Sequence, residues 1–156
     1  MSHIAIREVR SAAGLEEALA IRCQVFVAEQ GVREALEIDG LDGAARHLLA
    51  LWEDRPVGTL RLRWLDRGRV AKIERVAVLA AARGQKVGQA LMGAALDLAR
   101  AQGAVEARLH AQTTVQAFYA RLGFTAFGPE FEEDGILHIA MRRALTGREP
   151  LEADQA

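Results

Sequence analysis

The chain has 156 residues, of which 51% are hydrophobic and 26% are charged, a balance typical of one folded domain. A formal net charge of −1 excludes the strong positive charge of many nucleic-acid-binding proteins, and a single cysteine excludes an internal disulfide. No apolar run reaches the roughly 20 residues that cross a membrane. We therefore expect a cytoplasmic protein without a nucleic-acid or membrane partner.

Apolar periodicity divides the chain into strands and helices. Alternating or β-branched runs predict strands at residues 4–9, 47–52, 57–64, 72–78, 105–110, 124–127 and 136–142. Helical spacing predicts helices at residues 14–30, 87–99 and 113–122. The order β-α-(α)-β-β-β-α-β-α-β-β predicts an α/β domain over residues 1–145, with a mixed, mostly antiparallel central sheet flanked by helices.

Turn-forming residues mark the connections between these elements. Residues 32–45 are acidic and contain glycine, which predicts a loop with one short helical turn. Glu53–Pro56 is expected to be a four-residue hairpin loop, and residues 129–135 an acidic loop. A capping-box spacing between Thr113 and Gln116 marks the start of the last helix. The polar tail at residues 146–156 is expected to fray.

The segment Lys72–Ala99 carries the first functional signal. A β-branched run is followed by the turn Arg83–Gly88 and then by a helical pattern. Such a turn leaves backbone N–H groups unpaired at a helix start, where the helix dipole also favours anions. The simplest ligand for this arrangement is a phosphate group.

Two motifs then identify a resemblance. Arg83-Gly84-Gln85-Lys86-Val87-Gly88 matches the acetyl-CoA motif R/Q-x-x-G-x-G/A of the GNAT N-acetyltransferases, except that Lys86 replaces the middle glycine. Residues 118–124 (FYARLGF) carry the Y-x-x-x-GF pattern of the same family. The chain resembles this family over nearly its full length. It is most similar to the ElaA/YjcF branch, through residues 25–30, Asp39, Asp42, His47, 109–112 and 133–138.

This resemblance implies acetyl-CoA as cosubstrate and no metal. The pantetheine arm is expected along the strand edge at residues 76–78, where the Val78 amide would donate to the acetyl carbonyl. Lys86 either loosens the packing on the pyrophosphate or contacts a phosphate through its ammonium. The expected acetyl-CoA-binding residues are Val76, Ala77, Val78, Arg83, Gly84, Gln85, Lys86, Val87, Gly88, Gln89, Gln112, Phe118, Tyr119 and Arg121. Arg121 can equally be a surface charge.

The resemblance also implies catalytic residues. Tyr119 is the candidate acid for the thiolate leaving group, although its helical spacing with Phe118 and Leu122 also suits a core residue. Glu74 and His138 are the leading candidates for the base; Glu74 can instead be a salt-bridged strand residue. Three further candidates for the base are Glu29, His47 and His110.

The acceptor is not specified by the sequence. The acidic segments 34–42 and 130–134 can either attract a cationic amine or form solvated loops. The leading interpretation is an N-acetyltransferase acting on an amine; the alternatives are a catalytically degenerate CoA-binding protein and a nucleotide-binding domain. The nucleotide-binding alternative lacks both G-x-G-x-x-G and G-x-x-x-x-G-K-[ST]. Open edge strands are compatible with a homodimer.

Overall fold

The computed structural model describes residues 3–145, and the predicted polar tail lies outside them. All seven predicted strands are present, and they form a sheet in the order β1-β2-β3-β4-β5-β7-β6. The α/β class with a mixed, mostly antiparallel sheet is thereby confirmed. The strands are β1 (Ile4–Glu8), β2 (Arg46–Trp52), β3 (Arg55–Leu65), β4 (Val70–Val78), β5 (Glu106–Gln112), β6 (Thr125–Glu133) and β7 (Ile136–Ala144).

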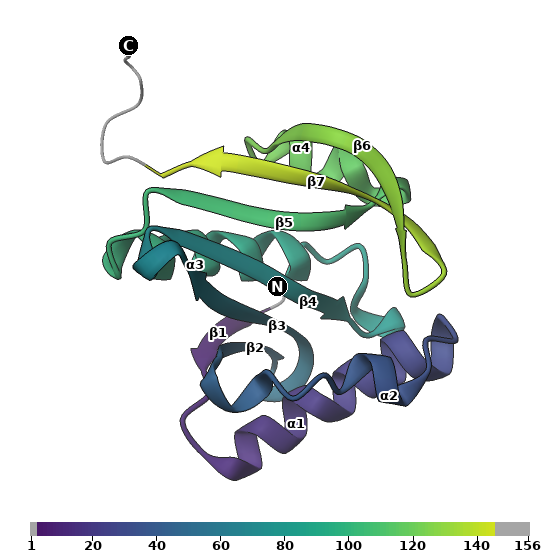
Figure 1. Ribbon diagram of the computed structural model, residues 1–156. Coiled ribbons are helices and arrows are strands. Elements are labelled where there is room, and N and C mark those ends of the chain that lie inside the picture. Colours follow the sequence, from purple (N-terminus) through teal and green to yellow (C-terminus); the bar gives the residue numbers. More distant parts are fainter. Residues whose placement is uncertain (1–2, 146–156) are drawn as a thin grey trace. The chain divides into compact units, whose positions relative to one another are not determined.

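The helices follow the predicted order (Figure 1). They are α1 (Ala12–Arg22), the π-helix η1 (Cys23–Glu29), α2 (Glu34–Glu37), α3 (Val87–Ala101) and α4 (Gln116–Arg121). Four short 3₁₀ turns are η2 (Asp42–Ala44), η3 (Asp66–Gly68), η4 (Ala80–Ala82) and η5 (Thr113–Val115). None of the helices within residues 3–145 is both long and apolar enough to cross a lipid bilayer.

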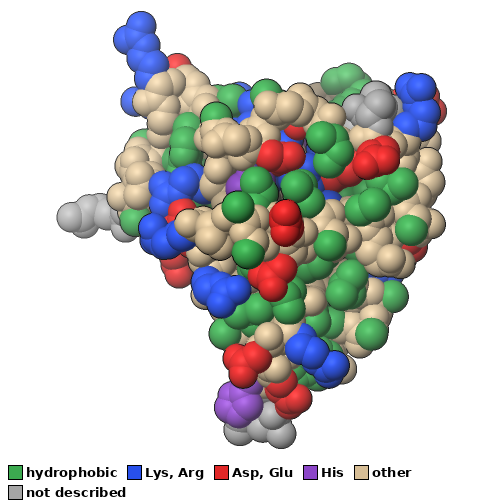
Figure 2. Space-filling model, turned by 90° about the horizontal axis from the view of Figure 1, so that it is seen from below, with side chains coloured by type: hydrophobic (Ala, Val, Ile, Leu, Met, Phe, Trp, Pro, Cys, Tyr) green, Lys and Arg blue, Asp and Glu red, His purple; other side chains and the backbone are tan. Residues whose placement is uncertain are grey.

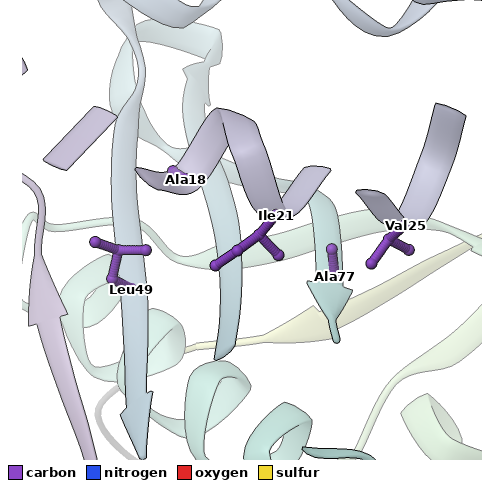
Figure 3. Close-up of a cluster of buried hydrophobic side chains, with 5 residues drawn as sticks. All are labelled: Ala18, Ile21, Val25, Leu49 and Ala77. Atoms are coloured by element: carbon purple, nitrogen blue, oxygen red, sulfur yellow. The ribbon is translucent and has the colours of Figure 1, made fainter. Parts of the chain in front are cut away.

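The described chain forms two compact units, one of residues 3–63 and 73–95 and the other of residues 64–72 and 96–145. In the first unit, α1 and η1 bury an apolar stripe against the sheet. Ala18, Ile21 and Val25 pack onto Leu49 of β2 and Ala77 of β4 (Figure 3). The predicted helix therefore exists, but residues 23–29 of it wind as a π-helix, a rare form that is often found at functional sites.

The first hairpin is tighter than predicted. Arg55 and Pro56 belong to β3, and only Glu53 and Asp54 connect it to β2. Both connecting residues are left-handed, with φ of +50° and +67°. The predicted four-residue loop is wrong because two-residue turns of this kind follow the right-handed twist of the strands.

In the second unit, β7 lies between β5 and β6, and both pairings are antiparallel. α4 packs against β5, on the face that carries the buried residues Leu109, Ala111 and Met141. The predicted acidic loop at 129–135 is wrong: β6 continues to Glu133, and only Asp134 and Gly135 form the turn. The predicted capping box is also absent, because neither η5 nor α4 has a side-chain cap.

Candidate functional site

The predicted phosphate-binding turn lies in the first unit, between η4 and α3. Arg83, Gly84, Gln85 and Lys86 form an exposed turn that leads directly into the helix. Gly84 and Lys86 both adopt left-handed backbone, with φ of +83° and +67°. Lys86 therefore follows the backbone path that glycine adopts most easily, so the substitution in the motif has not straightened the turn.

The start of α3 adds free amide groups to this turn. The first hydrogen bond of the helical pattern runs from Ala90 N to Lys86 O, at 3.1 Å. The amides of the first helical turn, including those of Val87, Gly88 and Gln89, therefore have no carbonyl partner within the helix. Gln89 is exposed, Gly88 is half-buried and Val87 is buried. An anion at this end would be stabilised by the amides and by the helix dipole.

Gly58 on β3 allows the helix start to approach the sheet closely. A Cβ atom at Gly58 would lie 3.0 Å from both Val87 Cγ1 and Leu91 Cδ1, and 3.2 Å from the carbonyl oxygen of Ala77. A side chain there would require Val87, Leu91 or the Ala77 carbonyl to move by a few tenths of an ångström. Sequence reasoning missed Gly58, because a glycine inside a strand signals a close approach without naming the partner.

Arg83 links the turn to η1 and to β4. Its Nη1 and Nη2 donate to the two carboxylate oxygens of Glu29 at 2.5 and 2.7 Å, and its Nε donates to the Val78 carbonyl at 3.0 Å. The hydrogen bond from Arg83 lowers the pKa of Glu29. A carboxylate held in this way is a weak base, so the geometry favours an ionic role for Glu29.

Strand β4 carries the residues expected to bind pantetheine. Val76 and Val78 are half-buried, and Ala77 is buried. Immediately before them, Arg75 has φ of +58°, a left-handed residue inside a strand. Such a residue is typical of a β-bulge, which changes the direction of the side chains and backbone groups that follow.

Glu74, a candidate base, is held by two arginines. Arg61 donates to its carboxylate from Nε at 3.0 Å, and Arg63 donates from Nε at 2.7 Å and from Nη2 at 3.1 Å. The side chain of Glu74 is only 11% exposed. The structure therefore brings Glu74 into ion pairs with Arg61 and Arg63, in keeping with the alternative of a salt-bridged strand residue.

Glu74 is one member of a larger arginine–carboxylate network in this unit. The network joins α1, α2, β3, β4 and the loop before β2 through eight ion pairs. Its members are Arg22, Arg61, Arg63, Arg75, Glu37, Asp39, Asp42 and Glu74. The hydrogen bond from Arg61 holds the pKa of Asp39 well below its usual range. The negative charge of the acidic segment 34–42 is thus largely balanced by arginines of the same unit. Figure 2 shows basic and acidic side chains interspersed on the face that carries α1 and α2.

Asp39, Asp42 and His47 also make hydrogen bonds within the protein. Arg61 Nη1 lies 2.9 Å from Asp39 Oδ1 and 3.0 Å from Asp42 Oδ1, so a guanidinium already joins the two carboxylates. His47 Nε2 lies 3.0 Å from the Asp42 carbonyl oxygen. Within residues 3–145, no three His, Cys, Asp or Glu side chains are arranged to hold a metal.

Tyr119 lies in the second unit, on α4. Its ring contacts Phe118 and Phe124 edge-on, with centroids 5.0 and 6.2 Å away. Burial raises the pKa of its phenol to about 12. Tyr119 is therefore both a core residue and a phenol that stays protonated at neutral pH. Of the other residues expected to bind acetyl-CoA, Gln112 and Phe118 are half-buried and Arg121 is exposed.

His138 and His110 lie on neighbouring parts of β7 and β5. The Nδ1 atom of His138 is 2.7 Å from the Ile136 carbonyl oxygen, so Nδ1 donates its hydrogen to that oxygen and Nε2 is not engaged by this contact. His110 Nδ1 is 3.1 Å from Glu133 Oε1. The ring of Phe131 meets His110 edge-on at 5.0 Å and stacks with His138 at 6.0 Å. We call His110, Phe131, Glu133 and His138 the imidazole face.

Comparison with known proteins decides the family. Residues 10–145 match the family model described as an acetyltransferase (GNAT) domain. The chain belongs to the GNAT acetyltransferase family. It is 39% identical to ElaA of Escherichia coli over 128 residues, which cover 80% of this chain and 84% of ElaA. YjcF of Bacillus subtilis is 35% identical over 130 residues, covering 83% and 91% of the two chains. The expected ElaA/YjcF resemblance is therefore confirmed.

Solved structures agree with this assignment. The crystal structure of E. coli ElaA superposes with a TM-score of 0.80 at 35% identity, covering 90% of this chain and 99% of the other. An aminoglycoside 6′-N-acetyltransferase complexed with coenzyme A shares the fold, with a TM-score of 0.75 at 12% identity and coverage of 92% and 98%.

Three features of this GNAT chain were missed from the sequence. They are the close approach at Gly58, the left-handed Arg75 in β4, and the contact between His110 and Glu133. Each depends on which residues face one another in the folded chain. Only Gly58 left a local signal, a glycine within an otherwise apolar strand.

Proposed function

We propose that this GNAT acetyltransferase transfers the acetyl group of acetyl-CoA to an acceptor amine by direct attack on the thioester. The observation that carries the proposal is the left-handed turn formed by Gly84 and Lys86, which opens onto the unpaired amides at the start of α3. These groups suit a pyrophosphate. Acetyl-CoA supplies the acetyl thioester, whose C–S bond is exchanged for a C–N bond to the acceptor.

The residues proposed to hold acetyl-CoA fall into two sets. In the first unit these are the turn from Arg83 to Gln89 and the strand residues 76–78, with the Val78 amide donating to the acetyl carbonyl. In the second unit these are Gln112, Phe118, Tyr119 and Arg121. A single well-placed donor to the carbonyl oxygen is worth roughly 3–4 kcal/mol of barrier.

Tyr119 is the proposed general acid. The departing thiolate needs a proton, and a phenol whose pKa is about 12 carries one at every pH at which the protein would work. Its burial also limits competition from solvent water. The proton given by the Tyr119 hydroxyl balances the one lost by the amine, so transfer to an ammonium group releases one proton overall.

His138 is the proposed base. Its Nδ1 hydrogen is engaged by the Ile136 carbonyl, which leaves the Nε2 lone pair to accept the amine proton. Glu74 is less suited to this role because two guanidinium groups hold its carboxylate as an anion. We infer that Glu74 instead balances the charge of Arg61 and Arg63.

The deciding experiment is thermal unfolding with acetyl-CoA, CoA, NAD and ATP, each added at a hundredfold excess over the dissociation constant expected for the cosubstrate. A ligand that binds only the native state adds about 2.7 kcal/mol of stability under this condition. We expect Tm to rise with acetyl-CoA and with CoA, but not with NAD or ATP. In a second assay, amines added to the protein with acetyl-CoA should release free thiol. The absence of a Tm shift would overturn the proposal; a shift without thiol release would support the degenerate CoA-binding alternative.

A further inference from the structure

The strands of the second unit present one continuous face of aromatic and polar side chains. Residues directly opposite one another in an antiparallel pair point to the same side of the sheet. His138 lies opposite Gln112 on β5 and opposite Phe131 on β6. His110 lies opposite Ala140, two residues along β7 from His138, and therefore shares this side.

This face is the one opposite α4. The α4 side is marked by Arg143, whose Nη1 donates to the Leu122 carbonyl at 3.1 Å just beyond the helix. Arg143 lies opposite Ala107 and shares its side of the sheet. Side chains alternate between the two sides along a strand, and His138 is an odd number of residues before Arg143, so His138 points to the other side. The imidazole face is thus separate from the packing around Tyr119, and its Glu133 and His110 side chains remain 39% and 36% exposed.

Glu133 is the anionic group of this face. The hydrogen bond with His110 lowers the pKa of Glu133, which burial alone would raise. The charge of Lys72 acts on the pKa of Glu133 in the same direction. The carboxylate is therefore ionised across the neutral range, and its partner His110 also makes edge-on contact with the ring of Phe131.

We propose that Glu133, oriented by His110, binds the ammonium group of the acceptor, and that the acceptor is a cationic primary amine whose apolar arm lies over Phe131. The inference rests on the proposed function, since it names the acceptor of that reaction. A carboxylate with a fixed partner and an aromatic ring alongside is a combination that recognises organic cations.

Glu133 and His138 have different tasks in this arrangement. A carboxylate of lowered pKa is a poor proton acceptor, so Glu133 holds the ammonium without deprotonating it. The Nε2 atom of His138 carries the lone pair that can take the proton. His110 is a positioning residue, because its Nδ1 contacts the Glu133 carboxylate rather than the acceptor.

The test uses the full chain with n-hexylamine, a cation at neutral pH, and aniline, a neutral amine. Glu133→Gln should raise KM for n-hexylamine about tenfold while kcat stays within threefold, and should leave KM for aniline unchanged. Glu133→Asp should recover part of the loss, and His110→Gln should raise KM about threefold. The matched control is Glu132→Gln, an exposed neighbour on β6 that points to the opposite side of the sheet; its KM should stay within twofold.

The outcomes separate this inference from the proposed function. Equal KM values for Glu133→Gln and Glu132→Gln would overturn the inference, and so would a fall in kcat with KM unchanged. If acetyl-CoA raises Tm but neither amine is acetylated, an NMR measurement of amine binding tests the inference. Adding n-hexylammonium should shift the imidazole ¹⁵N signals of His110 in the wild type and should not shift them in Glu133→Gln. Absence of that shift in the wild type counts against the inference alone, whereas absence of any acetyl-CoA effect on Tm counts against the proposed function.

Discussion

In the unit formed by residues 3–63 and 73–95, four arginines and four carboxylates pair with one another, and Arg22, Arg61 and Glu37 are at most 2% exposed. In the unit formed by residues 64–72 and 96–145, Glu133 and the two imidazoles lie partly open on one side of the sheet. The same residue types thus serve two purposes. Charges matched on every side within the protein hold loops and strands together, whereas a carboxylate that keeps part of its surface in solvent can still meet a substrate.

Removing one buried cation should produce the largest effect. Arg61→Met keeps the apolar stem of the side chain but leaves Asp39, Asp42 and Glu74 without their shared guanidinium. We expect a loss of about 3–5 kcal/mol in the free energy of unfolding, measured by urea denaturation. Arg63→Met is the matched control: its partner Glu74 keeps Arg61, so the loss should be about 1 kcal/mol or less.

The same variant should alter the response to acid. The folded-state pKa of Asp39 is lowered, chiefly by Arg61, so its contribution to stability is complete above the unfolded value near 4 and is lost as pH falls below it. Arg61→Met removes this contribution, and its unfolding free energy should therefore fall less steeply than that of the wild type below pH 4. Equal slopes would show that Asp39 gains nothing from Arg61.

Tyr119→Phe tests whether a core residue of the second unit also does chemistry. The phenyl ring keeps the contacts with Phe118 and Phe124, while the proton donor is lost. We expect kcat to fall about 100-fold or more, with the Kd for acetyl-CoA within a few-fold of the wild type, by thiol release and calorimetry. Unchanged turnover would assign Tyr119 to packing alone.

The raised pKa of Tyr119 also predicts a loss of stability in alkali. The unfolded phenol ionises near pH 10 and the folded one near pH 12, so its contribution is complete below pH 10 and declines as pH rises to 12. The difference between these two pKa values corresponds to roughly 2–3 kcal/mol. The difference between wild type and Tyr119→Phe in urea denaturation at pH 9 and pH 11 isolates this contribution.

Gly58→Ala tests how closely α3 must approach the sheet. The new methyl group would meet the Val87 and Leu91 side chains at 3.0 Å, so these side chains or the start of α3 must move by a few tenths of an ångström. We expect a loss of about 1–3 kcal/mol in stability and a weaker Kd for acetyl-CoA, because the unpaired amides move with the helix. Gly93→Ala is the control: its Cβ would meet nothing within 4 Å, and alanine should stabilise α3 by up to about 1 kcal/mol.

Local patterns were sufficient to predict the order of elements. Strand alternation and helical spacing depend on neighbouring residues, and Gly31 ends the first helical segment in the left-handed conformation expected of it. The two strands β6 and β7 were predicted, but the full length of β6 and its two-residue turn were missed, although Asp134-Gly135 is a strong turn signal. The glutamates before it gave the strand the composition of a loop, and pairing with β7 outweighed that local preference.

The candidate site could be predicted from the sequence only where its residues are consecutive in the chain. The turn from Arg83 to Gly88 is contiguous, so a motif was enough to find it. The contact of Glu133 with His110 joins residues 23 apart, and it depends on the register that β7 imposes on β5 and β6. Register is set by complete strands and their turns, so an error in the β6–β7 turn also hides the face that the hairpin builds.

Substitutions of Lys86 test the turn itself, and their expected effects on stability and binding are the smallest. Lys86→Gly removes the cost of a left-handed non-glycine residue and should raise stability by up to about 1 kcal/mol, whereas Lys86→Asn tolerates that conformation and removes only the charge. If the exposed ammonium attracts the pyrophosphate, both variants should weaken acetyl-CoA binding two- to fivefold at low salt. The difference from wild type should shrink at 1 M salt, because charges are then screened within about 3 Å. Weaker binding in Lys86→Asn than in Lys86→Gly would instead point to the backbone path as the feature that the coenzyme requires. Unchanged binding in both would show that the lysine contributes neither charge nor obstruction, and that the amides of α3 suffice.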